Sequence, residues 1–134
     1  KLANSPAVVV TGRVEDLRPY TQHALAAVAP MRIARGVQNK VLEAMAMDKP
    51  VVVTGKGLEG VDAQHGREVL VAESGADYVS ILDHVLKGKF GDVGPAARKY
   101  VKRNFDWDRN LPEVVLLLNP DQAPIPVAEV AYIG

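Results

Sequence analysis

The chain contains no cysteine, carries no net charge and has no long apolar run, and each absence narrows its function. Without cysteine it forms no disulfide and performs no thiolate chemistry, which permits a reducing compartment. Sixteen basic and sixteen acidic side chains cancel, so there is no broad positive field to capture nucleic acid. No apolar stretch approaches the roughly 18 residues that span a bilayer. Any anion site must therefore be local.

The histidines and the N-terminal sequence add two further absences. His23, His65 and His84 have no second histidine or carboxylate four residues away, so we expect no metal site. His65 is interpreted as a turn histidine in preference to a catalyst. Residues 1–6 include neither an initiator Met nor the charged-then-apolar order of a signal peptide. We therefore expect the chain to be a piece of a longer protein.

Short apolar runs recur along the 134 residues, a length at which one hydrophobic core commonly closes. The runs are near-continuous in Val, Leu and Ala, as in strands that are covered on both faces. Helical patterns separate them, and this alternation is typical of right-handed crossover units. We predict an α/β fold with a Rossmann-like, doubly wound parallel sheet. Its predicted strands are residues 8–11, 26–29, 51–54 and 69–72.

Helices are predicted between and after these strands. They cover residues 15–25, a stretch that begins near 37, and residues 77–86, 95–104 and 106–118. We assign residues 1–118 to one domain. Residues 119–134 are rich in proline and are predicted to form an extended tail, with an edge strand, a partner-facing arm and non-native sequence as alternatives.

A candidate ligand site follows from this topology, because open parallel sheets bind ligands outside the carboxyl ends of their strands. The second predicted loop ends in Gly36, which lets the backbone approach a ligand, and enters a helix near Val37. Unpaired amides and the positive dipole end at that helix start suit phosphate, and Lys40 adds a charge. The loops expected to meet there are residues 12–15, 30–36 and 55–60.

Glu43 is the second candidate on the same helix. It lies six residues beyond Val37, about 9 Å along the axis, which is roughly the distance from a bound pyrophosphate to the ribose hydroxyls. The alternative is a solvated ion pair between Lys40 and Glu43 at i, i+3. Apolar residues at 42 and 44–47 predict a mostly buried helix, in which the carboxylate needs a partner.

Three sequence stretches carry a resemblance to a known family. GRVEDLRPY, VAPMRIARGVQNKVLEAMAMDKPVVVTGKGLEGV and HGREVLVAE together resemble the C-terminal, donor-binding domain of glycosyltransferases with the two-domain GT-B fold. The similarity covers about residues 7–110 and is closest to the retaining family-4 group. Within that group it resembles bacterial sugar transferases associated with exopolysaccharide and PEP-CTERM sorting loci. The chain would then be a truncated, partial C-terminal half.

The resemblance implies roles for particular residues. Glu43 would hold the ribose of the donor, and Arg13 and Val14 would lie near the nucleobase. Arg35 stands where the family has a Glu that contacts the donor sugar, and a guanidinium cannot accept a hydrogen bond from a sugar hydroxyl. A surface loop arginine is the alternative for Arg35. The diphosphate would be bound by Gly36, Val37, Gln38, Asn39 and Lys40.

The implied activity belongs to a full-length parent enzyme. It is transfer of a sugar from a UDP- or GDP-linked donor to a glycan or lipid-linked acceptor, with retention, no catalytic metal and no other cofactor. Polysaccharide biosynthesis in the cytoplasm is the expected setting, including a peripheral place at the inner face of the membrane. The catalytic base is expected in an acceptor domain, so we expect the chain alone to be inactive.

Other classes of protein fit the sequence less well. A receiver domain needs an acidic cluster after its first strand, where this chain has Thr11, Gly12 and Arg13. A dinucleotide-dependent dehydrogenase needs a Gly-x-Gly-x-x-Gly motif directly after a strand, and none of the predicted strands of this chain is followed by that motif. The remaining alternative is a non-catalytic Rossmann-like interaction module. Whatever the parent does, we expect this chain to self-associate through an exposed sheet edge and apolar patch.

Overall fold

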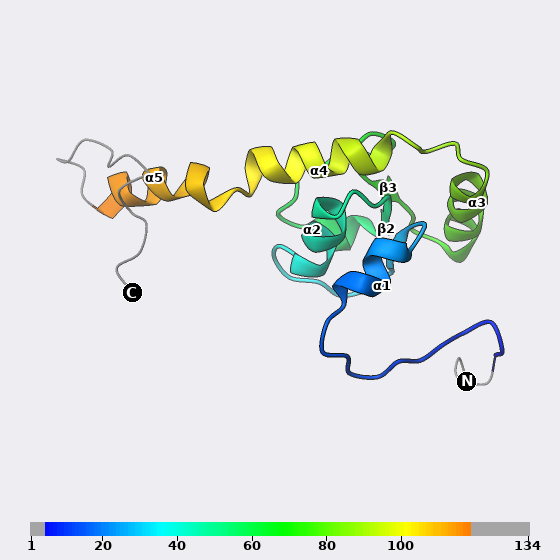
Figure 1. Cartoon of the computed structure of the whole chain (residues 1–134). Coiled ribbons are helices and arrows are strands. Elements are labelled where there is room, and N and C mark those ends of the chain that lie inside the picture. The colour runs from blue at the N-terminus through cyan, green and yellow to red at the C-terminus, as the bar shows by residue number, and fades with distance from the viewer. Residues whose placement is uncertain (1–4, 119–134) are drawn as a thin grey trace.

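A computed structural model describes residues 5–118 of the chain, except for the side chains of residues 113 and 117. The predicted tail, residues 119–134, lies outside the described residues. Helices and strands alternate over most of the described part, as Figure 1 shows. Their bounds are α1 Arg18–His23, β1 Ala27–Ala29, α2 Asn39–Ala46, β2 Val51–Val53, the 3-10 turn η2 Gly55–Leu58, β3 Leu70–Val71, α3 Gly75–Leu86, α4 Val93–Asn104 and α5 Trp107–Leu118.

The strands form a parallel sheet in the order β1-β2-β3. Ala27 pairs with Val51, and Val53 pairs with both Ala29 and Val71. The expected α/β, Rossmann-like fold is therefore confirmed. β2 is the central strand, and its three valines are all buried.

Helices cover both faces of the sheet. Val51 and Val53 point to a core shared with α2 and α4, whereas Val52 points to a core shared with α3. Consecutive side chains of a strand face opposite ways, so burial of all three valines requires cover on both sides. The first core consists of Val41, Ala44, Met45, Val51, Val53, Val61, Val69, Ala97 and Tyr100. The second consists of Val52, Leu70, Ala72 and Val93.

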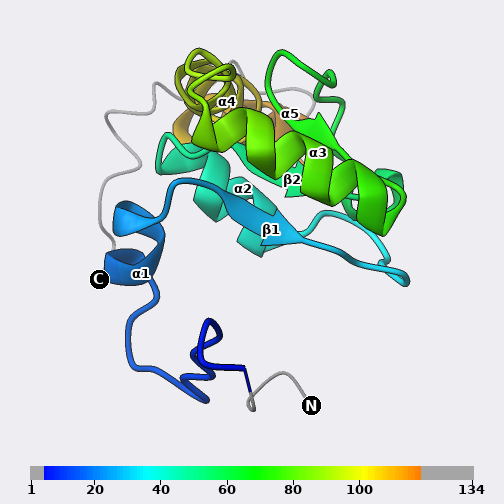
Figure 2. The same cartoon turned by 90° about the vertical axis from the view of Figure 1, so that its right-hand side faces the viewer.

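The strand predicted over residues 8–11 is not formed, and that prediction is wrong. This segment runs past the body of the molecule without joining the sheet (Figure 1), and Val9 is 85% exposed. Val8 donates its amide to the carbonyl of Ser5 at 3.0 Å, which is a turn contact. β1 instead lies at the edge of the sheet (Figure 2), with Val28 47% exposed. Branched apolar residues favour a strand only where a neighbouring strand completes the ladder.

Helix boundaries also depart from the prediction in places. α1 is shorter than the predicted 15–25 because Pro19 sits at its first turn and Ala24 is already extended. α3 begins at Gly75, where the side chains of Ser74 and Asp77 cap it reciprocally. Among the described residues, no helix is both long enough and apolar enough to cross a membrane.

The turn between α2 and β2 determines how α4 packs. Asp48 has a φ of 66°, a left-handed conformation that Asp adopts more readily than most residues at the end of a helix. Its carbonyl lies directly against Gly94, where any Cβ would fall on that oxygen and the carbon bonded to it. Glycine at 94 thus lets α4 lie close against α2 and closes the first core.

Candidate functional site

A cavity of about 590 Å³ lies between α2 and the chain segment that leads into α1. Its walls combine an apolar floor with charged side chains from both segments. The volume falls within the range of about 300–1,000 Å³ that is usual for small-molecule sites. The lining residues are Val14, Glu15, Asp16, Leu17, Arg18, Thr21, Ala27, Lys40, Glu43, Ala44, Ala46 and Met47.

α2 presents its two charged side chains to this cavity. Val41, Ala44 and Met45 are buried at i, i+3 and i+4, which leaves Lys40 and Glu43 on the exposed side. The prediction that Glu43 lies in a mostly buried element is therefore wrong. α2 buries one face only, because the sheet and α4 cover it from a single side.

The carboxylate of Glu43 has no protein partner among the described residues. No ion pair within 4.0 Å joins it to Lys40, and no hydrogen bond from the described part of the chain reaches it. The i, i+3 ion pair is thus not formed. Glu43 and Lys40 are both free to contact a ligand.

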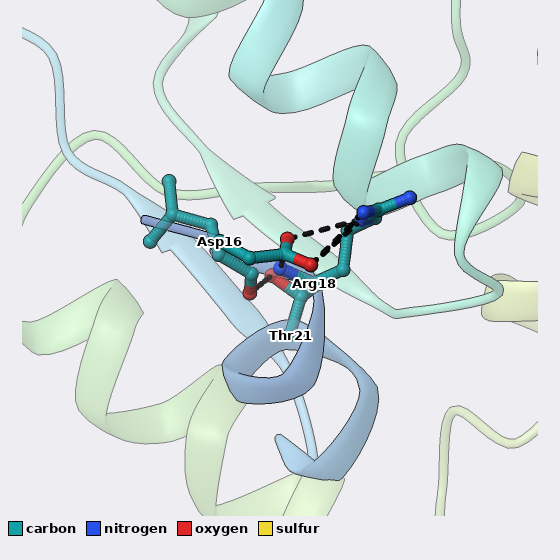
Figure 3. Close-up of polar contacts among 4 residues, drawn as sticks. Asp16, Arg18 and Thr21 are labelled. Carbon is teal, nitrogen blue, oxygen red and sulfur yellow. Dashed lines mark hydrogen bonds and ion pairs between the residues drawn. The ribbon is translucent and has the colours of Figure 1, made fainter. Parts of the chain in front are cut away.

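The opposite wall carries a fixed carboxylate, that of Asp16. Arg18 turns back onto it (Figure 3): its Nε lies 3.0 and 3.1 Å from the two carboxylate oxygens, and its Nη2 lies 3.0 Å from Oδ2. The Arg18 amide also donates to Oδ1 at 2.9 Å. Hydrogen bonding from Arg18 lowers the pKa of Asp16, and the same contact raises the pKa of Arg18. Asp16 is therefore ionised and oriented at neutral pH.

The start of α2 differs from the prediction. The helix begins at Asn39, so Val37 precedes it, and Glu43 lies four residues into the helix, about 6 Å along its axis. The Gln38 side chain donates to the carbonyls of Arg35 and Gly36 at 3.1 and 3.0 Å and does not cap the helix. The first amides of any helix have no intrahelical acceptor, and in α2 these include the amides of Asn39 and Lys40.

Some of the predicted site residues meet in the cavity and others do not. Val14, Lys40 and Glu43 line it together, although they come from two separate segments. Arg13 and Arg35 are exposed and do not line it. The remaining predicted residues do not line the cavity and lie in the loop before α2 and at its first residue: Gly36, Val37, Gln38 and Asn39. Gly36 has a φ of 63°.

The sequence did not indicate the Asp16 wall. Asp16, Leu17 and Arg18 line the cavity beside Glu15, yet only Glu15 lay within the loop that was expected at the site, residues 12–15. The sequence feature that could have indicated this wall is an acid and an arginine two residues apart, Asp16 and Arg18, directly before Pro19. Because Asp16 engages the Arg18 guanidinium, Lys40 is the lining cation that has no ion pair among the described residues.

The third predicted loop is held by internal contacts. It forms η2, where the amide of Gly55 donates to Oε1 of Glu73 at 2.8 Å. The hydroxyl of Thr54, the residue before η2, donates to the Met31 carbonyl at 2.7 Å. His65 accepts a hydrogen bond from the Val71 amide at 2.8 Å through Nδ1. That contact ties the turn before β3 to the end of the strand, in agreement with the structural role predicted for His65.

The fold is an α/β domain with a cavity along the flank of a crossover helix, α2. The sequence profile of the family described as glycosyl transferases group 1 matches residues 1–87, and the chain belongs to that family. Membership implies a sugar donor and an acceptor as partners in general terms. Comparisons with curated proteins and with solved structures find no match.

Proposed function

We propose that the chain is the nucleotide-sugar-binding part of a retaining glycosyltransferase that transfers a sugar to a glycan or lipid-linked acceptor in polysaccharide biosynthesis. The observation that carries this proposal is the meeting of Val14, Lys40 and Glu43 in one cavity of suitable size. We propose that the parent enzyme works in the cytoplasm, where it uses a nucleotide sugar as donor, and that it needs no cofactor.

The proposed donor lies along α2. Its diphosphate contacts the ammonium of Lys40 and the first free amides of the helix, which favour anions. Its ribose hydroxyls donate to the unpaired carboxylate of Glu43 about one turn further on. The nucleobase extends toward Val14 on the opposite wall, beside the oriented carboxylate of Asp16. In this proposal Arg35 and Gly36, which lie in the loop before α2 and outside the cavity lining, would approach the donor sugar and the diphosphate.

The chemical role of these groups is electrostatic. When the bond between the anomeric carbon and the diphosphate breaks, negative charge grows on the departing oxygen. Lys40 and the amides of the first turn are already oriented toward that charge, so they stabilise the transition state more than the ground state. Deprotonation of the acceptor is assigned to the acceptor domain of the parent.

Calorimetric titration with UDP and with GDP tests the site. Glu43→Gln keeps the size of the side chain but removes its charge, so we expect nucleotide affinity to fall by about 10- to 100-fold. Asp92→Asn is the matched control, because Asp92 is an exposed acid outside the cavity and outside the predicted site loops, and its side chain does not cap α4. Unchanged affinity in Glu43→Gln, with the fold intact by circular dichroism, would remove Glu43 from the site.

A second candidate function is an interaction module. It is favoured by β1, which is hydrogen-bonded on one side only and has an exposed Val28. Such an edge can pair with the same edge of a second copy. Sedimentation velocity over a range of concentrations distinguishes the two, since a monomer at high concentration contradicts self-association and leaves the nucleotide site untouched.

A further inference from the structure

A second recess lies between α4 and the turn that leads into β3. It has a volume of about 190 Å³ and shares no lining residue with the cavity beside α2. Three of the side chains around it are cationic and one is acidic. The lining residues are Arg67, Glu68, Ala96, Lys99, Tyr100 and Arg103.

The cations of α4 all lie on one side of the helix. At about 100° per residue, the buried residues Gly94, Ala97 and Tyr100 form one face, and the cations form the opposite one. No acid occurs between Val93 and Asn104 to balance them. The exposed cations are Arg98, Lys99, Lys102 and Arg103.

Lys99 and Arg103 are the two α4 cations that reach the recess. They are one turn apart at i, i+4, a spacing at which like charges repel. Neither has an ion pair within 4.0 Å among the described residues. An anion placed between them would offset this repulsion.

Glu68 does not supply that anion. It is buried, 5% exposed; its Oε2 accepts from the Gln64 amide at 3.0 Å, and its Oε1 forms an ion pair with Nε of Arg67 at 3.1 Å. The buried carboxylate is thus committed to the turn, and it holds the Arg67 guanidinium at the rim of the recess. The terminal nitrogens of Arg67 have no hydrogen bond or ion pair from the described residues.

We propose that this recess binds a phosphoryl group, held by Arg67 from one side and by Lys99 and Arg103 from the other. Guanidinium groups pair with phosphate oxygens through two parallel hydrogen bonds, and an ammonium adds a compact charge. Three cations against one committed carboxylate leave a local excess of positive charge in a chain whose total is zero. The site is independent of the nucleotide site.

Inorganic phosphate titrated into the 134-residue chain, at ionic strength matched with sodium chloride, tests the recess by amide NMR. We expect shifts centred on Arg67, Lys99 and Arg103. Lys99→Gln with Arg103→Gln should weaken phosphate binding by about thirtyfold, whereas Arg98→Gln with Lys102→Gln should change it by less than about threefold. The two double variants remove the same charge from the same helix.

If both double variants weaken phosphate binding equally, the proposal is wrong, because phosphate would then respond only to the overall charge of α4. Shifts in the unaltered chain that avoid the recess overturn it as well, without relying on any variant. Glu43→Gln should leave phosphate binding here unchanged, so failure of this site and failure of the nucleotide site are distinguishable.

Vesicles separate the two sources of a phosphoryl group. Sedimentation with phosphatidylcholine vesicles is compared with sedimentation when phosphatidylglycerol is added. Binding to the anionic vesicles that is lost in Lys99→Gln with Arg103→Gln assigns a lipid headgroup. Phosphate binding without vesicle binding assigns a soluble phosphorylated compound. Absence of both overturns the proposal.

Discussion

The pentapeptide VVVTG occurs twice in the chain, at residues 8–12 and 51–55, and the two copies have opposite structures. In the second copy Val52 is fully buried and the valines form β2. In the first copy Val9 is 85% exposed and no strand is assigned. Identical local sequence therefore does not determine the conformation here, and the difference must come from the surroundings.

The surroundings of β2 supply everything that the first copy lacks. β1 and β3 flank β2 on its two edges, α2 and α4 cover one face, and α3 covers the other. Residues 8–10 have no strand pairing within the described part of the chain. Strand preference of Val reflects its fit to a covered, pleated surface, so the preference is realised only where the cover exists.

The threonines of the two copies show the same contrast. The hydroxyl of Thr54 donates to the Met31 carbonyl at 2.7 Å and accepts from the Gly57 amide at 3.2 Å, which joins the loop after β1 to the turn after β2. The hydroxyl of Thr11 contacts only the carbonyl of the next residue, Gly12, at 3.3 Å. One threonine organises tertiary structure and the other does not.

The largest expected effect on stability comes from introducing a charged side chain at the middle valine of each VVVTG copy. Val52→Asp buries a carboxylate with no partner and should cost more than about 4 kcal/mol, a large part of a typical domain stability. Val9→Asp places the same group in solvent and should change the free energy of unfolding by less than about 0.5 kcal/mol. Thermal unfolding by circular dichroism measures both variants.

If Val52→Asp loses the cooperative unfolding transition and Val9→Asp keeps it, the difference between the two copies is confirmed. A large destabilisation by Val9→Asp would break it, because it would show that residues 8–10 are buried in solution, either in the sheet or against a second copy.

A smaller effect is expected for the threonines. Thr54→Val preserves shape but removes the hydroxyl that donates to the Met31 carbonyl, at a cost of about 1–3 kcal/mol, whereas the Gly57 amide keeps its hydrogen bond to the Thr54 carbonyl at 2.9 Å. Thr11→Val removes an exposed contact and should be neutral within about 0.5 kcal/mol. Urea unfolding gives both values from the midpoints, provided the slope is unchanged. Equal values for the two variants would contradict the difference in role.

Most of the fold follows from the sequence because its signals are local. The buried runs predicted β1, β2 and β3 to within about two residues, and the alternation predicted their parallel order. Apolar spacing and glycine signals placed α3, α4 and α5 to within about two residues, although the capping pair Ser74 and Asp77 that begins α3 was not used. The strand at residues 8–11 failed because pairing is a property of distant neighbours, which composition does not report.

The candidate site could be predicted only in part for a related reason. Helical spacing identified Lys40 and Glu43, and the resemblance identified Val14, but the exposure of Glu43 depends on which face of α2 the sheet covers. The Asp16–Arg18 contact is local yet gives no signal distinct from an ordinary surface pair. The recess at α4 brings Arg67 and Arg103 together from far apart in the sequence, and no spacing rule anticipates that.

The smallest expected effect is a difference in pH dependence between two exposed aspartates. Asp77 accepts from the amides of Ser74 and Glu73 at 2.8 and 3.1 Å, and hydrogen bonding to Ser74 lowers its pKa. Arg18 likewise lowers the pKa of Asp16. A carboxyl whose pKa is depressed by folding stabilises the fold above its unfolded pKa, about 3.9, and that contribution is lost as the pH falls through the folded pKa.

Only Asp77 should show this linkage. Its contacts require the start of α3, whereas Asp16 and Arg18 are two residues apart and can pair in the unfolded chain as well. Asp77→Asn should therefore lower stability at neutral pH, and the deficit should close below about pH 4; Asp16→Asn should show no deficit at any pH. Urea unfolding across this range measures both. An acid-sensitive deficit in Asp16→Asn would mean that the segment before α1 folds together with the sheet, which is the opposite of what its exposed valines indicate.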